Sequence, residues 1–413
     1  MSKSNNQLWE IQINSVSKKL AAIFLILIGA GILVYRTGNL FIAAWITRNG
    51  TLDPAIYERA IRYDPKNADY HFILAQIYNH STPYLNPLRA QQEYEAAARL
   101  NPDRANHWGE LSKYYEQAGD TARSRQAMQM ALEKDPHYAQ THWAAANLYL
   151  RLGDLQPADL ELRQTADLDV SYLEQVLDLG WHFYQNPRKV MDTYVPNTKD
   201  ANLIALNYFV ARRDQDGAAL AWDRLRTFKT TTRERFPYVD HLVSIEMPQA
   251  AWEIFSSNNK VDASGFFNPG FETDPMNGGF DWRFTSWANA RARRDATMAR
   301  DGLASFLVTF NGKENVDYSQ LWHWLPVRKG ASYNLRFWMK TEAVSTDEGM
   351  FVEIDGRASE KQIGSNDWKQ LAIPFTARTE LVTVRLRRVP SKKLDNLLKG
   401  KVWVDGFSLT GRP

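Results

Sequence analysis

Residues 105–138 read ANHWGELSKYYEQAGDTARSRQAMQMALEKDPHY, and residues 139–172 read AQTHWAAANLYLRLGDLQPADLELRQTADLDVSY. The two stretches place aromatic, small and apolar residues at matching positions, and Gly119 and Gly153 fall at the same offset. The matching pairs are Trp108 and His142, Leu111 and Ala145, Tyr115 and Tyr149, Ser124 and Ala158, Met128 and Leu162, and Ala131 and Thr165. A constant period of about 34 residues is typical of a helix–turn–helix unit that stacks on copies of itself.

A third copy precedes these two, with three residues added at its turn within 80–87. Its matching positions hold His71, Leu74, Ala75, Tyr78, Ala90, Tyr94, Ala97 and Pro102. Prolines at 65, 102 and 136 end the second helix of each unit. On these residues the sequence resembles the tetratricopeptide repeat family over 68–169, which implies an α-solenoid with a concave face that binds protein. A generic helical bundle is the alternative, although a bundle does not require constant spacing.

Length and composition limit the possible classes of protein. At 413 residues the chain exceeds one ordinary core, so about two or three domains are expected. Cysteine is absent from the sequence, which excludes thiol catalysis, thiolate metal sites and disulfides. The net charge of +3 is uneven, because residues 260–413 carry 23 Lys and Arg against 18 Asp and Glu. This excess of +5 leaves −2 on the rest of the chain.

The N-terminal region predicts a membrane anchor. A polar segment, 1–19, ends in Lys18 and Lys19 and is followed by residues 20–35, which carry no charge. A membrane-spanning helix needs about 20 residues, and flanking cations can shorten that requirement. We therefore predict a single signal anchor at 20–35 with 1–19 in the cytoplasm and the remainder exported, as across a bacterial inner membrane. A cleaved signal peptide and a buried soluble helix are the alternatives.

Helical patterns continue beyond the three repeats. Residues 52–65 look like the second helix of a partial repeat, and 202–226 resemble one more degenerate repeat. The solenoid is therefore predicted to occupy 50–257. A polar stretch at 256–264, SSNNKVDAS, separates it from the rest of the chain.

After this stretch the sequence predicts an antiparallel β-sandwich at 260–413, because short alternating runs are separated by Gly, Asn and Asp. The predicted strands are 305–310, 318–327, 332–340, 350–354, 368–375, 381–387 and 401–409. The domain opens with NPGFE at 268–272 and closes with VWVDGFSL at 402–409. These motifs resemble the carbohydrate-binding jelly rolls with a galactose-binding-like fold. The predicted fold class is therefore multidomain α plus β, with a transmembrane helix, a solenoid and a sandwich.

The jelly-roll resemblance implies that the first and last strands meet, which would bring Glu272 and Asp405 together. In such folds these positions often help to hold a structural calcium ion, a cation that prefers oxygen ligands. The alternative is that the two carboxylates only cap strand ends. No other cofactor is implied.

Tryptophans suggest where a glycan would bind, because sugar-binding sheets lay an aromatic ring against a pyranose face. Alternation in the second predicted strand, 318–327, places Tyr318, Gln320, Trp322 and Trp324 on one face, which is a candidate ligand surface. Trp282 lies in a loop-like stretch between two charged residues and is a second, exposed candidate. The alternative is that these tryptophans fill the core of the sandwich.

Arginines account for the positive charge of this domain. Arg385 and Arg387 alternate with apolar residues, so one strand face is basic, and 291–294 read RARR. Clustered cations attract acidic polymers or anionic head groups, whereas the alternative is an ordinary solvated face. Nucleic acid is not expected as a partner, because an exported domain would not meet it.

The sequence contains no HExxH, GxSxG or phosphate-binding glycine loop, so no enzyme is predicted. The leading hypothesis is a membrane-anchored envelope scaffold that binds protein on its solenoid and polysaccharide on its jelly roll, in export or assembly of surface polysaccharide. The second hypothesis is a purely protein-binding assembly factor, and the third is a glycan-active enzyme with an unrecognised site.

Overall fold

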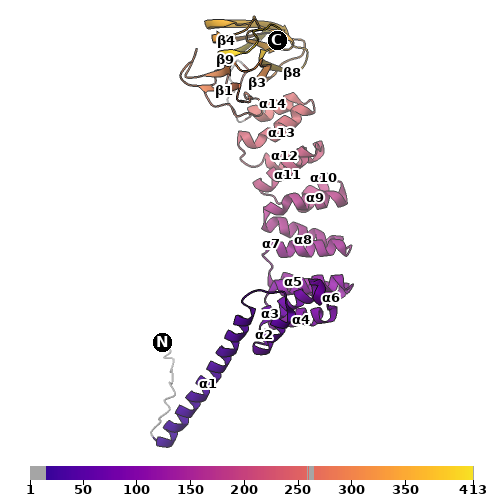
Figure 1. Ribbon diagram of the computed structural model, residues 1–413. Helices are drawn as coiled ribbons and strands as arrows, with labels where there is room; N and C mark the ends of the chain where they lie inside the picture. Colours follow the sequence, from indigo (N-terminus) through magenta and orange to yellow (C-terminus); the bar gives the residue numbers. More distant parts are fainter. Residues whose placement is uncertain (1–14, 258, 260–264, 413) are drawn as a thin grey trace, which may run out of the picture. The chain divides into compact units, whose positions relative to one another are not determined.

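The computed structural model describes residues 15–257, 259 and 265–412 and divides into two compact units, Met1–Tyr172 and Leu173–Pro413. The first unit is helical, whereas the second begins with helices and ends in strands (Figure 1). The division falls inside the predicted solenoid rather than at the polar stretch 256–264. Residues 1–14 of the predicted cytoplasmic segment, and most of that stretch, lie outside the described residues.

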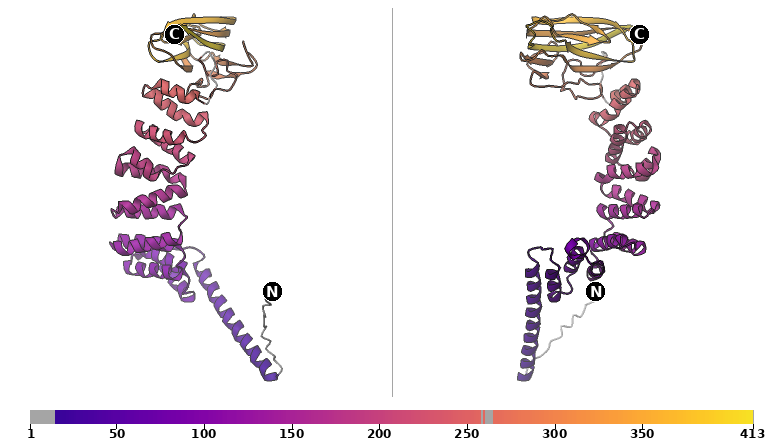
Figure 2. Two further views of the ribbon diagram at one scale, coloured as in Figure 1. Left: turned by 180° about the vertical axis from the view of Figure 1, so that it is seen from behind. Right: turned by 45° about the vertical axis from the view of Figure 1, so that its right-hand side comes forward.

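The helices of the first unit form consecutive pairs that lie side by side in the views of Figure 2. They are α1 (Val16–Thr47), α2 (Pro54–Tyr63), α3 (Ala68–His80), α4 (Pro87–Leu100), α5 (Ala105–Gln117), α6 (Thr121–Lys134), α7 (Ala139–Arg151) and α8 (Leu155–Leu168), with 3-10 turns at η1 (Thr82–Tyr84) and η2 (Val170–Tyr172). Gly119 and Gly153 form the predicted turns with φ of +79° and +78°, a backbone conformation that favours glycine.

One hydrogen bond recurs in each of the three repeats. A ring N–H at the aromatic position of the first helix donates to the carbonyl oxygen of the proline six residues earlier. The pairs are His71 Nε2 and Pro65 (3.3 Å), Trp108 Nε1 and Pro102 (2.8 Å), and His142 Nε2 and Pro136 (3.0 Å). We call this contact the proline clip. It ties each first helix to the preceding unit and explains why imidazole can replace indole at this position.

Helix α1 is longer than the predicted span at 20–35, because it continues without a break to Thr47. It is long and apolar enough to cross a membrane. Near its C-terminal end Ala43 is fully buried, and this part of α1 packs against α2. The partial repeat predicted from 52–65 is thereby completed by the end of the apolar helix itself.

The helices of the second unit continue the pairwise arrangement. They are α9 (Leu173–Tyr184), α10 (Pro187–Tyr194), α11 (Lys199–Ala211), α12 (Gln215–Leu225), α13 (Thr232–Ser244) and α14 (Pro248–Ser256). The degenerate repeat predicted at 202–226 corresponds to α11 and α12. Its turn holds Arg213 at φ +58°, where the regular repeats have glycine. A capping box between Thr231 and Glu234 begins α13.

The described strands form two antiparallel sheets, as predicted. The strands are β1 (Ala290–Asp295), β2 (Ser305–Asn311), β3 (Tyr318–Pro326), β4 (Ser332–Val344), β5 (Phe351–Ile354), β6 (Arg357–Ala358), β7 (Gly364–Thr376), β8 (Leu381–Arg388) and β9 (Lys399–Arg412). The larger sheet has the order β1-β2-β9-β4-β7 and the smaller sheet has the order β3-β8-β5-β6. All predicted strands are present, and β1 and β6 were not predicted.

The core of the sandwich lies between the sheets and is rich in aromatic side chains, including Phe266, Phe271, Phe306 and Phe407. A β-bulge between Tyr318 and Leu321 changes the alternation predicted for β3. Tyr318 therefore points into the core and not outward with Trp322, which corrects the predicted face.

Candidate functional site

The smaller sheet brings most of the predicted glycan platform onto one outward face. In the register of β3 and β8, Trp322 lies opposite Arg385 and Trp324 lies opposite Thr383. The predicted residues that follow this alternation and are half-buried are Gln320, Trp322, Trp324, Arg385 and Arg387. We call this surface the β3–β8 face.

The two tryptophan rings of this face are already in contact with each other and with an arginine. Their ring centroids lie 5.1 Å apart, and the Arg283 guanidinium lies 5.0 Å from the Trp322 centroid and 4.5 Å from the Trp324 centroid. Arg283 also forms an ion pair with Asp240 of α13. The ion pair therefore joins the sandwich to α13, and the cation–π contacts cover part of each indole.

Trp282 is fully buried, which corrects the prediction of an exposed loop aromatic. Its ring packs against Phe271 and Phe407 at centroid distances of 4.8 and 4.6 Å, and its Nε1 donates to the carbonyl oxygen of Asn268 at 3.0 Å. The preceding Asp281 is also buried, and burial raises its pKa to about 6. This stretch is part of the core and offers no surface to a ligand.

The predicted basic face is partly neutralised. Arg387 pairs with Asp317 at 3.2 Å and with Glu353 at 3.7 Å, whereas the half-buried Arg385 forms no ion pair with the described residues. The arginines at 291–294 lie on β1, where Ala290 and Ala292 face the core. The alternation of small and charged residues hid this strand from prediction.

Glu272 and Asp405 lie near each other, as the jelly-roll resemblance implies. Both carboxylates flank Gly270, and one oxygen of each lies 3.5 Å from the position that a Cβ atom of residue 270 would occupy. Their oxygens accept backbone N–H groups, Asp405 from residues 300–301 at 2.8 and 3.2 Å and Glu272 from Leu303 at 3.0 Å. Within the described residues no group of three or more His, Asp or Glu side chains could hold a metal ion. The contacts fit the capping alternative, and the structural calcium ion stays a prediction.

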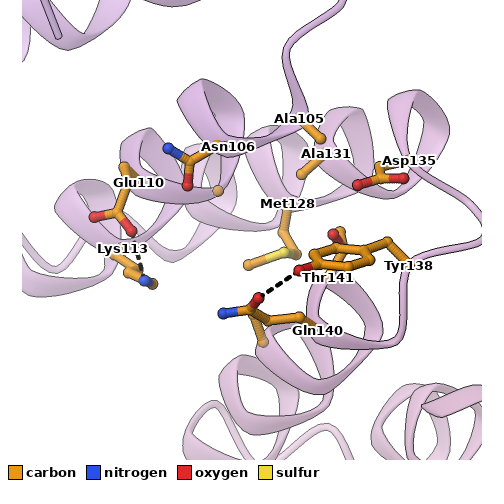
Figure 3. Close-up of a pocket in the computed structure, with 12 residues that line it drawn as sticks. Ala105, Asn106, Glu110, Lys113, Met128, Ala131, Asp135, Tyr138, Gln140 and Thr141 are labelled. Carbon is orange, nitrogen blue, oxygen red and sulfur yellow. Dashed lines mark hydrogen bonds and ion pairs between the residues drawn. The ribbon is translucent and has the colours of Figure 1, made fainter. Parts of the chain in front are cut away.

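A groove between α5 and α7 is the candidate site that the sequence analysis did not locate (Figure 3). It consists of two adjoining pockets of about 180 and 260 Å³ that share Lys113, Met128, Gln140 and Ala144. We call it the α5–α7 groove. Met128, Ala131 and Leu148 form an apolar floor and are buried.

The rim of the groove is polar and nearly neutral. Lys113 pairs with Glu110 at 2.6 Å, and Arg151 binds Glu116 through two hydrogen bonds of 2.5 and 2.8 Å. Figure 3 shows the Met128 side chain directed toward Tyr138 and Gln140, whose side chains are joined by a 3.0 Å hydrogen bond.

A periodic signal in the sequence could have revealed this groove. Asn106 and Gln140 occupy the same position of successive repeats, as do Lys113 and Asn147. These residues lie on the first helix of each repeat and point away from the positions that hold the repeats together. Polar residues that recur at matching positions of the first helices, 34 residues apart, therefore mark the open face.

Comparison with known proteins agrees with the repeat assignment. Residues 86–139 and 111–163 match the family model described as tetratricopeptide repeat. These residues include α5, α6 and α7, and hence most of the groove. No curated protein matches the chain.

Among solved structures, one of MamA is 14% identical, covers 45% of this chain and 93% of its own, and has a TM-score of 0.28. Another structure of MamA is 21% identical, covers 32% of this chain and 76% of its own, and has a TM-score of 0.27. PilF from Pseudomonas aeruginosa is 13% identical, covers 55% of this chain and 93% of its own, and has a TM-score of 0.28. On its matched residues, this chain contains tetratricopeptide repeats, units of the kind found in protein-interaction scaffolds.

Proposed function

We propose that the protein is a non-enzymatic scaffold of the cell envelope that holds a segment of a partner protein in the α5–α7 groove. The observation that carries this proposal is the continuous trough between neighbouring first helices, with an apolar floor and a polar rim. An apolar floor can bury side chains of a bound segment, and the amides of Asn106 and Gln140 can pair with its backbone.

Gly109 offers a direct test, because no heavy atom outside its own stretch of helix lies within 4 Å of the place where its Cβ would lie. It lines the groove from α5. Gly109→Trp should fill the groove without a clash at the backbone, and a partner that the wild-type chain captures from membrane extracts should be lost. Gly109→Ala is the matched control, since it adds one methyl group and favours the helix.

The identity of the lost partner decides the outcome. A protein retained by Gly109→Ala and lost by Gly109→Trp supports binding in the groove. Equal retention by both variants, with both chains folded by circular dichroism, would contradict it.

The scaffold is proposed to be anchored by α1 in a bacterial-type inner membrane, with the repeats and the sandwich exported. Lys18 and Lys19 precede the apolar residues and favour a cytoplasmic N-terminus, although Arg36 and Arg48 lie on the other side. A reporter that is active only after export, fused behind Pro413, should be active. Cleavage of the repeats by a cytoplasmic protease would contradict this orientation.

A second candidate function is glycan binding by the sandwich, in export or assembly of surface polysaccharide. The gathering of Gln320, Trp322, Trp324, Arg385 and Arg387 on the β3–β8 face favours it. Titration with acidic and neutral polysaccharides at low and high salt tests it, because stacking on an aromatic ring resists salt and surface ion pairing does not. Without glycan binding, the sandwich would be a second protein-binding module, and the chain would be a protein-binding assembly factor.

A further inference from the structure

A cleft lies within the second unit, between α14 and two loops of the sandwich. It consists of adjoining hollows of about 490 and 430 Å³ that share Glu380. Ligand pockets of about 300–1,000 Å³ are common, and many lie where two domains meet. We call it the junction cleft and define it by Gln249, Trp252, Arg328, Tyr333 and Glu380.

The two walls of the cleft are fixed relative to each other by aromatic packing. Trp252 meets Phe280 of the sandwich at 5.1 Å between ring centroids, and Phe255 meets Phe280 at 5.6 Å. Phe236 of α13 lies against Gly278, where a Cβ would come within 2.1 Å of its ring. Only a residue without a side chain allows this approach, so the shape of the cleft is built into the fold.

The aromatic side chains of the cleft are half-buried and held in place. The Tyr333 ring stacks on Phe375 at 5.7 Å, and its hydroxyl accepts the backbone N–H of Arg328 at 2.9 Å. Gly411 admits the ring, since a Cβ there would lie 2.5 Å from it. Trp252 and Tyr333 thus present ordered rings to a ligand at little cost in conformational entropy.

The polar side chains of the cleft, by contrast, have no partner within the described residues. Gln249, Arg328 and Glu380 are exposed, and no side-chain hydrogen bond or ion pair joins any of them to the protein. Their neighbour Arg378 is already bound to Asp355 at 3.1 Å. An amide, a guanidinium and a carboxylate therefore remain available around two fixed rings.

We propose that the junction cleft is a saccharide-binding subsite. A pyranose presents a flat C–H surface to an aromatic ring and hydroxyl groups to its surroundings, and the free amide, guanidinium and carboxylate groups can donate to and accept from neighbouring hydroxyls. The larger hollow has a mostly polar lining, which favours a polar ligand. This inference rests on the proposed glycan-binding function but places the ligand between α14 and the sandwich, and not on the β3–β8 face.

The test uses the full chain in a detergent without a sugar head group. Hexasaccharides of β-1,4-linked glucose, β-1,3-linked glucose and β-1,4-linked mannuronate are titrated by calorimetry. The double variant Gln249→Ala/Glu380→Gln should weaken binding of the preferred probe at least tenfold, because it removes two free polar groups and no internal contact. Trp322→Ala, on the β3–β8 face, is titrated in parallel. Gln370→Ala, at an exposed position of β7 outside the cleft, is the control that should bind as the wild type does.

Each alternative result has a defined meaning. Binding that is lost in Trp322→Ala and kept in the double variant overturns the junction cleft but retains glycan binding by the sandwich. Binding of none of the three probes by the wild type overturns both. Trp252→Phe keeps an aromatic ring against Phe280 but has a smaller surface for stacking. Weaker binding by this variant with an unchanged melting temperature would show that the stacking surface is lost while the fold is intact.

Discussion

Arg388 shows how one residue can have a role that its neighbours in sequence do not share. It belongs to an arginine-rich run, yet its side chain is fully buried on the core side of β8. Its Nη1 donates to Asn315 Oδ1 at 2.7 Å and to the Val316 carbonyl at 2.6 Å. Burial lowers the pKa of this guanidinium. The cation serves as a hydrogen-bond donor to loops that would otherwise have unpaired acceptors.

Arg388→Met should therefore destabilise the sandwich by roughly 3–5 kcal/mol, because several buried acceptors lose their donor. Chemical denaturation followed by tryptophan fluorescence measures the change. Arg385→Met is the control on the outward face of the same strand and should change stability by less than about 1 kcal/mol. Equal losses would show that Arg388 does not act through its buried hydrogen bonds.

The proline clip of the third repeat predicts a dependence on pH. Burial lowers the pKa of His142, but the Glu161 carboxylate at 2.5 Å and the Pro136 carbonyl outweigh burial, so the pKa is raised overall. Because the folded pKa lies above the unfolded value of about 6.5, the contribution to stability is complete below that value. It is lost as the pH rises through the raised pKa of the folded chain.

Glu161→Gln should consequently destabilise α7 and α8 below about pH 6.5 and have little effect at alkaline pH. Hydrogen exchange of peptides from these helices, corrected for the intrinsic rate at each pH, measures the difference. An effect of the same size at both pH values would contradict a protonated His142.

At the scale of single residues, the sequence predicted which face of a strand a side chain lies on better than it predicted whether that side chain is exposed to solvent. It placed Trp322 with Trp324 on one strand face and Arg385 with Arg387 on another, because strand alternation determines direction, but it did not predict that the two strands are neighbours. It placed Trp282 wrongly because a tryptophan between charged residues looks exposed unless its long-range contacts, such as that with Phe407, are known.

At the scale of elements, the turns of the helical pairs offer a matched exchange. Gly153 and Arg213 both have φ above zero, at +78° and +58°. A left-handed conformation costs a residue with a side chain about 1–2 kcal/mol. Gly153→Ala should therefore destabilise the turn between α7 and α8 by about 1 kcal/mol, and Arg213→Gly should stabilise the turn between α11 and α12 by a similar amount. Thermal melting of both variants is the measurement: the melting temperature should fall for Gly153→Ala and rise for Arg213→Gly.

Helix α1 can be mapped with single cysteines, because the natural chain has none. The charge-free run at 20–35 spans only about 24 Å at 1.5 Å per residue, against a hydrocarbon core of about 30 Å. Protection from a membrane-impermeant maleimide should therefore extend past Arg36 to Leu40 and Phe41, which are apolar and exposed in the first unit. Labelling should resume at Arg48. Rapid labelling at Ile26 or Ile28 would contradict a membrane span.

Elements with a strong period were predictable, and those without one were not. The 34-residue repeat and the alternating strands specified α3–α8 and most of the sandwich. Strand β1 was missed because its core positions are alanines, which carry little strand preference. The length of α1 was missed because residues 36–39, RTGN, interrupt the apolar run with a charge, two polar residues and a glycine.

At the scale of the whole molecule, the last helices belong with the sandwich. Phe255 packs on Phe267 at 5.2 Å and on Phe280 at 5.6 Å, and Asp240 pairs with Arg283. A fragment of 173–413 should therefore be more stable than one of 265–413, by roughly 2–4 kcal/mol for the aromatic contacts that the shorter fragment loses. Denaturant unfolding of the two fragments measures the difference in stability. Equal midpoints would show that the folding units divide at the polar stretch 256–264.

No sequence pattern could have revealed this grouping, because the contacts join residues from a helical region to residues of a loop. Composition changes at 256–264, and a change of composition is a reasonable guide to where folding units end. Packing between Trp252 and Phe280 crosses that boundary and decides the grouping instead.

The unbroken course of α1 into its contact with α2 also has a mechanical consequence. A flexible tether transmits only tension, whereas a continuous helix transmits rotation as well. Any force that turns or tilts the N-terminal half of α1 must move Ala43 against α2, since no proline interrupts the helix between them. The anchor would then act as a stiff shaft, through which torque applied in the bilayer reaches the first repeat.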